Sequence, residues 1–337
     1  MNKITIKDIA DRAQVSKSTV SRVLNNSGPV NIKTREKVNE VIKSFEYAPS
    51  AIARNLSRQQ SSTIGVLIPE IENPFFGEIL KQISDEISKK NLTMICFNSG
   101  NEPEKDEEAL RIMKEYSVKG LIYTAADDYR PHDRQKNKIR LLEKINAPIV
   151  LLDRRIPELE NVDGVYFDNY RAAYESVKAL ACAGHRKIGI INADLRRVLA
   201  RERQSGFEDA LRDLKLELRN DYIFLGDYTI ERAYGLSKKC LNMSDPPTAI
   251  LSCNNFTSLG FLRASMEYGN ADGSRIACIG FDRLDINLIG FDFNYIERNV
   301  AEMGKKSIEF LLNRFNPESV KERQEYIIKP QLVLFNM

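Results

Sequence analysis

The chain has 337 residues, 42% of them hydrophobic and 29% charged, a composition typical of an ordinary folded protein with room for more than one domain. No basic segment followed by an apolar one stands at the N-terminus and no long uncharged apolar run follows, so we expect a cytoplasmic protein with no membrane span. The five cysteines and two histidines are widely separated, which argues against a metal site or a disulfide framework, and we expect no cofactor.

The net charge of +3 conceals a basic start. Residues 1–60 hold eleven Lys and Arg against five Asp and Glu, a balance of +6 that leaves −3 on the rest of the chain. A small basic module ahead of a near-neutral body is the charge distribution expected when a DNA-binding domain precedes a sensor domain.

Two short helices are predicted at the start of the chain. Thr5 and Asp8 can form a capping box for a first helix over about 6–13, and Ser16 can cap a second one. Helices this close must cross steeply, as in a helix-turn-helix, whose second helix lies in the DNA major groove. Three side chains would then face base edges: Lys17, Ser18 and Arg22. Lysine and arginine can donate to guanine, although a helical hairpin with solvated charges would show the same spacing.

A third helix, capped by Asn31, is expected to close a small core over the first two. A further short helix can start at Ser50 and end near Leu56, before a polar linker over 57–62. So short a helix is not stable alone in water.

Apolar strand-like runs alternate with helical stretches from Thr63 onward, which predicts βαβ units and parallel sheets. The alternation pauses near residue 165 and then resumes, so we expect two α/β lobes. In open parallel sheets ligands bind beyond the carboxyl ends of the strands, and two facing lobes would form a cleft there.

The N-terminal stretch resembles, almost residue for residue, the headpiece of the LacI/GalR family of bacterial transcription regulators. The family signature appears as Lys7-Asp8-Ile9-Ala10, Val15-Ser16 and Thr19-Val-Ser-Arg-Val-Leu-Asn25. Gln14 departs from it, because the family usually has glycine in that turn. If the turn needs a positive φ, glutamine is strained there by about 1 kcal/mol.

The resemblance implies a small all-α helix-turn-helix headpiece joined by a hinge helix to a two-lobed α/β domain of the periplasmic-binding-protein type, with parallel sheets. The implied domains are a headpiece over 1–49, a hinge helix and linker over 50–62, and an effector-binding and dimerisation domain over 63–337. Within the last, we expect an N-lobe over about 63–165 and 294–323, and a C-lobe over about 166–293 and 324–337. The last helix, about 299–314, would return to the N-lobe and the final strand, about 324–334, to the C-lobe.

The resemblance also implies which residues contact double-stranded operator DNA. The expected set is Thr5, Lys7, Ser16, Lys17, Ser18, Thr19, Ser21, Arg22, Asn25, Asn31, Ala53, Arg54 and Leu56. Leu56 matches the family leucine that wedges into the minor groove at the central base step, a contact that bends the DNA. Alternatively, Leu56 packs under the linker.

Family positions in the cleft map onto a second set of residues. They are Asn73, Phe75, Phe76, Asp153, Arg154, Arg197, Arg203, Asn254, Asn255, Asp282 and Arg283, with Arg201 a weaker candidate. Asn255 and Arg283 stand where relatives carry carboxylates that bind neutral sugars. A cleft with several arginines favours an anionic carbohydrate effector such as a sugar acid, since arginine pairs with a carboxylate through two hydrogen bonds. If Arg283 instead pairs with a nearby Asp or Glu, the effector is a neutral sugar.

We therefore expect a homodimeric, allosteric transcription regulator that represses carbohydrate-metabolism genes. A sugar-metabolising enzyme is disfavoured, because the sequence has no glycine-rich phosphate loop, no nucleophile elbow and no nucleophile–base pair. A solute-binding protein is disfavoured by the basic start and the missing signal peptide. A protein corepressor in place of a sugar stays open, as do the effector's identity, the operator sequence and the direction of the response.

Overall fold

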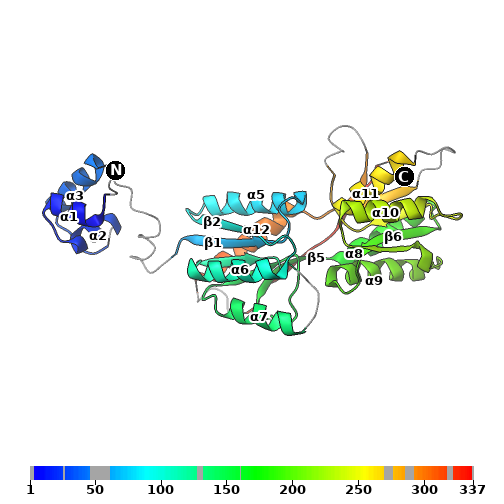
Figure 1. The fold of residues 1–337 in the computed structure, drawn as a ribbon, viewed down its shortest axis with the longest axis horizontal. Helices are drawn as coiled ribbons and strands as arrows, with labels where there is room; N and C mark the ends of the chain where they lie inside the picture. The colour runs from blue at the N-terminus through cyan, green and yellow to red at the C-terminus, as the bar shows by residue number, and fades with distance from the viewer. Residues whose placement is uncertain are drawn as a thin grey trace. The chain divides into compact units, whose positions relative to one another are not determined.

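The computed structural model describes residues 4–25, 27–45, 61–126, 132–159, 161–268, 276–284, 292–316 and 322–335 (Figure 1). The chain divides into two units, Met1–Ser62 and Thr63–Met337. In the parts of the chain described, no helix combines the length and apolar character that crossing a membrane requires.

The first unit contains three helices in its described part: α1 (Ile6–Ala13), α2 (Lys17–Asn25) and α3 (Ile32–Ser44). Apolar residues at helical spacing meet in one small core, listed as Ile9, Ala10, Ala13, Val20, Val23 and Val38. The predicted capping box is present at α1, where the backbone N–H of Thr5 donates to Asp8 at 2.7 Å and that of Asp8 to Thr5 at 3.4 Å. The hydroxyl of Thr5 also donates to the Asp8 carboxylate at 2.7 Å, and this bond together with the one from the Thr5 N–H lowers the pKa of Asp8. Caps matter here because so small a core leaves little stability in reserve.

Gln14 ends α1 in the left-handed conformation, with φ 55° and ψ 45°. The turn therefore does require a positive φ, and the strain expected for a side chain at this position applies. The Gln14 side chain accepts a 3.3 Å hydrogen bond from Lys37 on the surface.

Ser16 and Asn31 cap the next two helices by accepting from Thr19 N–H at 3.1 Å and Lys33 N–H at 2.9 Å. The expected hinge helix, with Leu56, lies outside the described residues.

The second unit contains two α/β lobes, each built on a sheet with six strands among the residues described. The first-lobe sheet has strand order β11-β5-β4-β3-β1-β2, and all of its pairings are parallel. Its strands are β1 (Thr63–Ile68), β2 (Thr93–Asn98), β3 (Gly120–Tyr123), β4 (Ile149–Leu152), β5 (Asp163–Phe167) and β11 (Glu325–Ile328). Helices α5 (Pro74–Ser88) and α12 (Val300–Asn313) pack together on one face, with α6 (Pro103–Glu115) and α7 (His132–Glu143) together on the other (Figure 1).

The second-lobe sheet has strand order β12-β10-β9-β8-β6-β7, parallel except for the antiparallel pair of β10 and β12. Its strands are β6 (Ile188–Ala193), β7 (Ile223–Gly226), β8 (Ala249–Ser252), β9 (Ala277–Phe281), β10 (Asn294–Glu297) and β12 (Gln331–Val333). A short 3-10 helix, η1 (Asn220–Tyr222), precedes β7. Helices α8 (Asn169–Cys182) and α9 (Val198–Asp213) pair with each other, as do α10 (Ile230–Leu241) and α11 (Asn255–Glu267).

The expected fold class is confirmed for the helical headpiece and the two lobes, but two lobe assignments are wrong. β10 extends the second-lobe sheet beside β9, although residues 294–323 were expected in the first lobe. The final strand, expected over about 324–334 in the second lobe, is two strands separated by Lys329 and Pro330, and proline lacks the N–H needed to continue a strand ladder. β11 pairs with β5 in the first lobe and β12 with β10 in the second. The described chain thus passes between lobes after β5, β10 and β11.

We expect Gln14→Gly to stabilise the headpiece by up to about 1 kcal/mol, because glycine adopts a positive φ without strain. The greater conformational entropy of glycine in the unfolded chain offsets part of this gain. Hydrogen exchange of the headpiece helix amides in the full-length protein measures this free energy. Glu40→Gly is the matched control: Glu40 is exposed within α3, where glycine should destabilise by about 1 kcal/mol. Equal destabilisation by both substitutions would show that the turn is not strained.

Candidate DNA-binding surface and effector cleft

The start of α2 presents a polar and basic surface. Lys17, Ser18 and Arg22 are exposed, whereas Val20 and Val23 on the same helix are buried. The hydroxyl of Ser16 lies 2.7 Å from that of Ser18 and 2.9 Å from that of Thr19, so several donors gather at the helix N-terminus. A backbone N-terminus with hydroxyl and cationic side chains suits phosphate and base-edge contacts.

The other expected DNA contacts fall into three groups. Thr5 and Lys7 are exposed at the start of α1, and Asn31 is exposed at the cap of α3. Ser21 is half-buried and Asn25 is the last residue of α2. Ala53, Arg54 and Leu56 lie outside the described residues, so their roles stay predictions.

In the second unit, residues at the carboxyl ends of parallel strands meet between the lobes, as expected. Asn73 precedes and caps α5, accepting from Phe75 N–H at 3.1 Å. Its side-chain oxygen also accepts from Asn255 of the second lobe at 2.7 Å. Both asparagines are buried, with exposed fractions of 6% and 2%. A buried amide contact therefore joins the two lobes.

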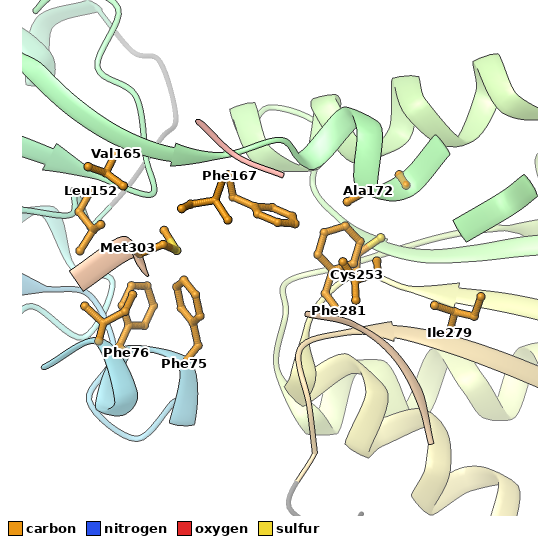
Figure 2. Close-up of a cluster of buried hydrophobic side chains, with 14 of the residues drawn as sticks. Phe75, Phe76, Leu152, Val165, Phe167, Ala172, Cys253, Ile279, Phe281 and Met303 are labelled. Carbon is orange, nitrogen blue, oxygen red and sulfur yellow. The ribbon is translucent and has the colours of Figure 1, made fainter. Parts of the chain in front are cut away.

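Aromatic rings line this junction. Phe75 and Phe76 make an edge-to-face pair with centroids 5.0 Å apart, and Phe167 meets Phe281 edge-on at 6.3 Å. Figure 2 shows Phe76 and Phe75 beside Met303 in the first lobe, with Phe281 in the second. Phe76 belongs to the continuous core that runs through both lobes, and only 4% of it is exposed.

Arg203 is a buried cation on α9, only 3% exposed. Its Nε donates to Asn169 at 2.9 Å, its Nη1 donates to the backbone carbonyl of Cys253, and its guanidinium lies 4.2 Å from the centroid of Phe281. Burial alone lowers the pKa of Arg203, but the surrounding electronegative groups, among them Asp153 and Asp282, more than offset it and raise the pKa overall. Arg203 thus lies within electrostatic reach of both carboxylates.

Arg298 is the central residue that sequence reasoning missed. It directly follows β10, a strand that the sequence pattern did not predict, so Arg298 was not expected at the carboxyl end of a strand. Its side chain donates to both oxygens of Asp282, by Nη2 at 2.6 Å, and to Asp153 at 3.4 Å. The guanidinium carbon lies 3.4 Å from the centroid of Phe75.

Arg154 and Arg283 make their described contacts away from this cluster. Arg154 is buried and donates to the carbonyls of Ala125 and Ala126 at 2.6 Å each, where it holds the segment after β3. Arg283 instead forms a 3.3 Å ion pair with Glu78, and both side chains are about half exposed, at 44% and 51%. This pairing with a nearby carboxylate is the alternative that the sequence left open.

Three further candidates lie around the ends of helices. Arg197 is half-buried at the N-cap position of α9, and Asn254 caps α11 by accepting from Thr257 N–H at 2.7 Å. Arg201 is exposed and donates to the backbone carbonyl of Leu195 at 3.1 Å.

A small cavity lies at the lobe junction beside these residues. Phe75 and Glu78 of α5 line it together with Asn255, Asp282 and Arg283 of the second lobe. Its volume is about 50 Å³. Pockets that hold small ligands usually measure roughly 300–1,000 Å³. This cavity is therefore too small for a sugar ring as the described residues stand.

Two family models match the chain. Residues 5–50 match the bacterial regulatory proteins of the lacI family, and residues 61–328 match the periplasmic binding proteins and sugar binding domain of the LacI family. The chain belongs to the LacI family. As a LacI-family transcriptional regulator it is not an enzyme, which confirms both the expected family and the expected absence of catalysis.

Named relatives cover nearly the whole length. The ribose operon repressor of Haemophilus influenzae is 31% identical over 98% of this chain and 97% of its own, and the HTH-type transcriptional repressor PurR of Mannheimia succiniciproducens is 29% identical with the same coverage. Among solved structures, the lac repressor dimer bound to operator and the anti-inducer ONPF superposes with a TM-score of 0.82 at 26% identity, covering 99% of both chains.

Glu202, on α9 beside the cleft, offers a test of the electrostatics of the cleft. Burial raises its pKa above the usual 4.5, against a hydrogen bond from Asn169 that lowers it. Ionised Glu202 therefore costs folding energy, and stability falls as pH rises from the usual glutamate pKa through the raised one. We expect Glu202→Gln to raise the melting temperature at neutral pH and to have no effect well below pH 4.5.

Glu325 is the control of opposite sign. A paired hydrogen bond from Arg155 lowers its pKa, so it stabilises the fold above the usual glutamate pKa and that contribution is lost as pH falls through the lowered one. Glu325→Gln should lower the melting temperature at neutral pH, with the gap closing in acid. Thermal unfolding of both variants across pH measures this, and a gain that persists in acid would rule out a titration effect at Glu202.

Proposed function

We propose that this chain is a homodimeric transcriptional repressor of carbohydrate-metabolism genes, which binds double-stranded operator DNA through its headpiece and a small carbohydrate effector in the cleft between its lobes. The observation that carries the proposal is the exposed basic start of α2 on a capped helix-turn-helix, in a chain whose relatives over its full length are named repressors.

Dimerisation follows from how such headpieces read DNA. One recognition helix covers too few base pairs for specific binding, whereas two related by a two-fold axis read a partly palindromic site. The lac repressor structure similar to this chain is of a dimer on operator, which supports the same arrangement here.

For the effector, the charge balance of the cleft supports a neutral sugar over the sugar acid expected from the sequence. Arg283, the main reason for the anionic prediction, is paired with Glu78. Buried Arg298 is paired with both Asp153 and Asp282, and buried Arg154 donates to backbone carbonyls of the first lobe. An added anion would therefore compete with Asp153 and Asp282 for Arg298 and with Glu78 for Arg283, whereas sugar hydroxyls can both donate to the carboxylates and accept from the arginines.

Arg22→Ala tests the DNA surface. We expect it to weaken binding to the selected operator by about 1–3 kcal/mol if Arg22 reads a guanine, while binding to random DNA changes much less. An operator is first selected from a random duplex pool, and gel shifts then compare both DNAs across a salt series. Wild-type affinity should fall steeply with salt through counterion release. A flat salt dependence would contradict DNA binding by this basic module.

Calorimetric titration tests the effector. We expect binding of a neutral pentose or hexose and none of the corresponding uronate or sugar phosphate, because Arg298 and Arg283 are already paired with carboxylates. Tight binding of a uronate alone would restore the anionic prediction. The absence of any heat or thermal shift with sugars would favour a protein corepressor.

A further inference from the structure

Arg298 lies where the chain crosses from β10 in the second lobe to α12 in the first. The next residue, Asn299, caps α12 by accepting from Glu302 N–H at 3.2 Å. The Arg298 side chain is 5% exposed, so its guanidinium is almost wholly removed from water. A buried cation is stable only when opposite charges and hydrogen bonds replace its hydration.

The partners of Arg298 come from both lobes. Asp282, at the end of β9, belongs to the second lobe and receives two hydrogen bonds from Nε and Nη2. Asp153, at the end of β4, belongs to the first lobe and lies 3.4 Å from Nη1. Phe75 of the first lobe offers its ring face to the guanidinium, 3.4 Å from its centroid. Two carboxylates and an aromatic face form a site suited to a planar cation.

We propose that Arg298 is a built-in ligand of the cleft. Its guanidinium occupies a cation site shared by the two lobes and holds them closed with no effector bound. A small ligand that closes a two-lobed domain does so through contacts that it makes with both lobes only in the closed form, and Arg298 makes such contacts from within the chain.

The other polar contacts described between the lobes do not replace it. The ion pair of Arg283 with Glu78 is exposed, and exposed pairs contribute little. The contact of Asn255 with Asn73 is buried but neutral. Without Arg298, Asp153 and Asp282 would lose the cation that hydrogen-bonds to both, since Arg203 donates to other groups, and water must then enter to solvate them. Opening of the lobes is the way to admit that water.

The inference has a consequence for the effector, and this part rests on the proposed function. The guanidinium already covers the Phe75 face, and the cavity beside it measures about 50 Å³. A sugar ring that stacks on Phe75 must therefore displace Arg298. The free energy of displacing Arg298 would therefore be subtracted from the binding free energy of the effector.

Chemical rescue of Arg298→Ala tests the cation site in the full-length protein without DNA or effector. We expect the variant to show a larger radius of gyration in solution scattering and a lower melting temperature. Methylguanidinium at millimolar concentration should reverse both changes saturably, because it restores a planar cation with paired donors, whereas urea, planar but neutral, should not. The matched control is Arg283→Ala, which should keep the wild-type radius and show no response to methylguanidinium.

Asp153→Asn keeps the experiment decisive if Arg298→Ala does not fold. It leaves the pair of Arg298 with Asp282 inside the second lobe and weakens only the partner in the first, so it should enlarge the radius with an unchanged circular dichroism spectrum. A wild-type radius in this variant, or an Arg298→Ala protein that stays compact and ignores methylguanidinium, would overturn the proposal. Operator binding by the wild-type chain is measured separately, so failure of the repressor assignment is distinguishable.

Discussion

The two carboxylates at the ends of β4 and β9 impose the constraint on which the second unit depends. Asp153 and Asp282 are 4% and 8% exposed, and charges so buried require a cation close by. Arg298 meets this need from a segment that passes between the lobes, so satisfying the charges also couples the two sheets. Both carboxylate-bearing residues have a positive φ, 63° and 69°, which is unfavourable without a glycine. The backbone is thus held in strained turns that aim both groups at one point.

The headpiece solves a different problem, which is stability with very little core. Its three helices bury few side chains, so the capping box of Thr5 and Asp8 and the cap of Asn31 supply hydrogen bonds that a larger domain can spare. The strained turn at Gln14 works against them. Apolar residues face inward, which leaves the donors at the start of α2 exposed, so the same packing that stabilises α2 also displays its recognition side chains.

Local signals predicted the caps, the helix-turn-helix and the alternation of strands and helices, because each depends on residues only a few positions apart. Lobe membership was harder, since whether β10 and β11 join one sheet or the other depends on pairing partners far away in the chain. Pro330 was the available signal that the last strand is two, because proline cannot continue a ladder of hydrogen bonds. It lies between the end of β11 at Ile328 and the start of β12 at Gln331.

The cleft shows why arginines resist prediction from sequence position alone. The order of the strands fixes where each strand ends, and short side chains near those ends meet as expected: Asn73 contacts Asn255, and Asp153 and Asp282 share one cation. An arginine reaches several ångströms further in any direction, so Arg154 turns to backbone carbonyls and Arg283 to Glu78 although both follow cleft strands. Which groups an arginine side chain contacts depends on which buried acceptors lack another partner. Those acceptors are known only once the sheets are assembled.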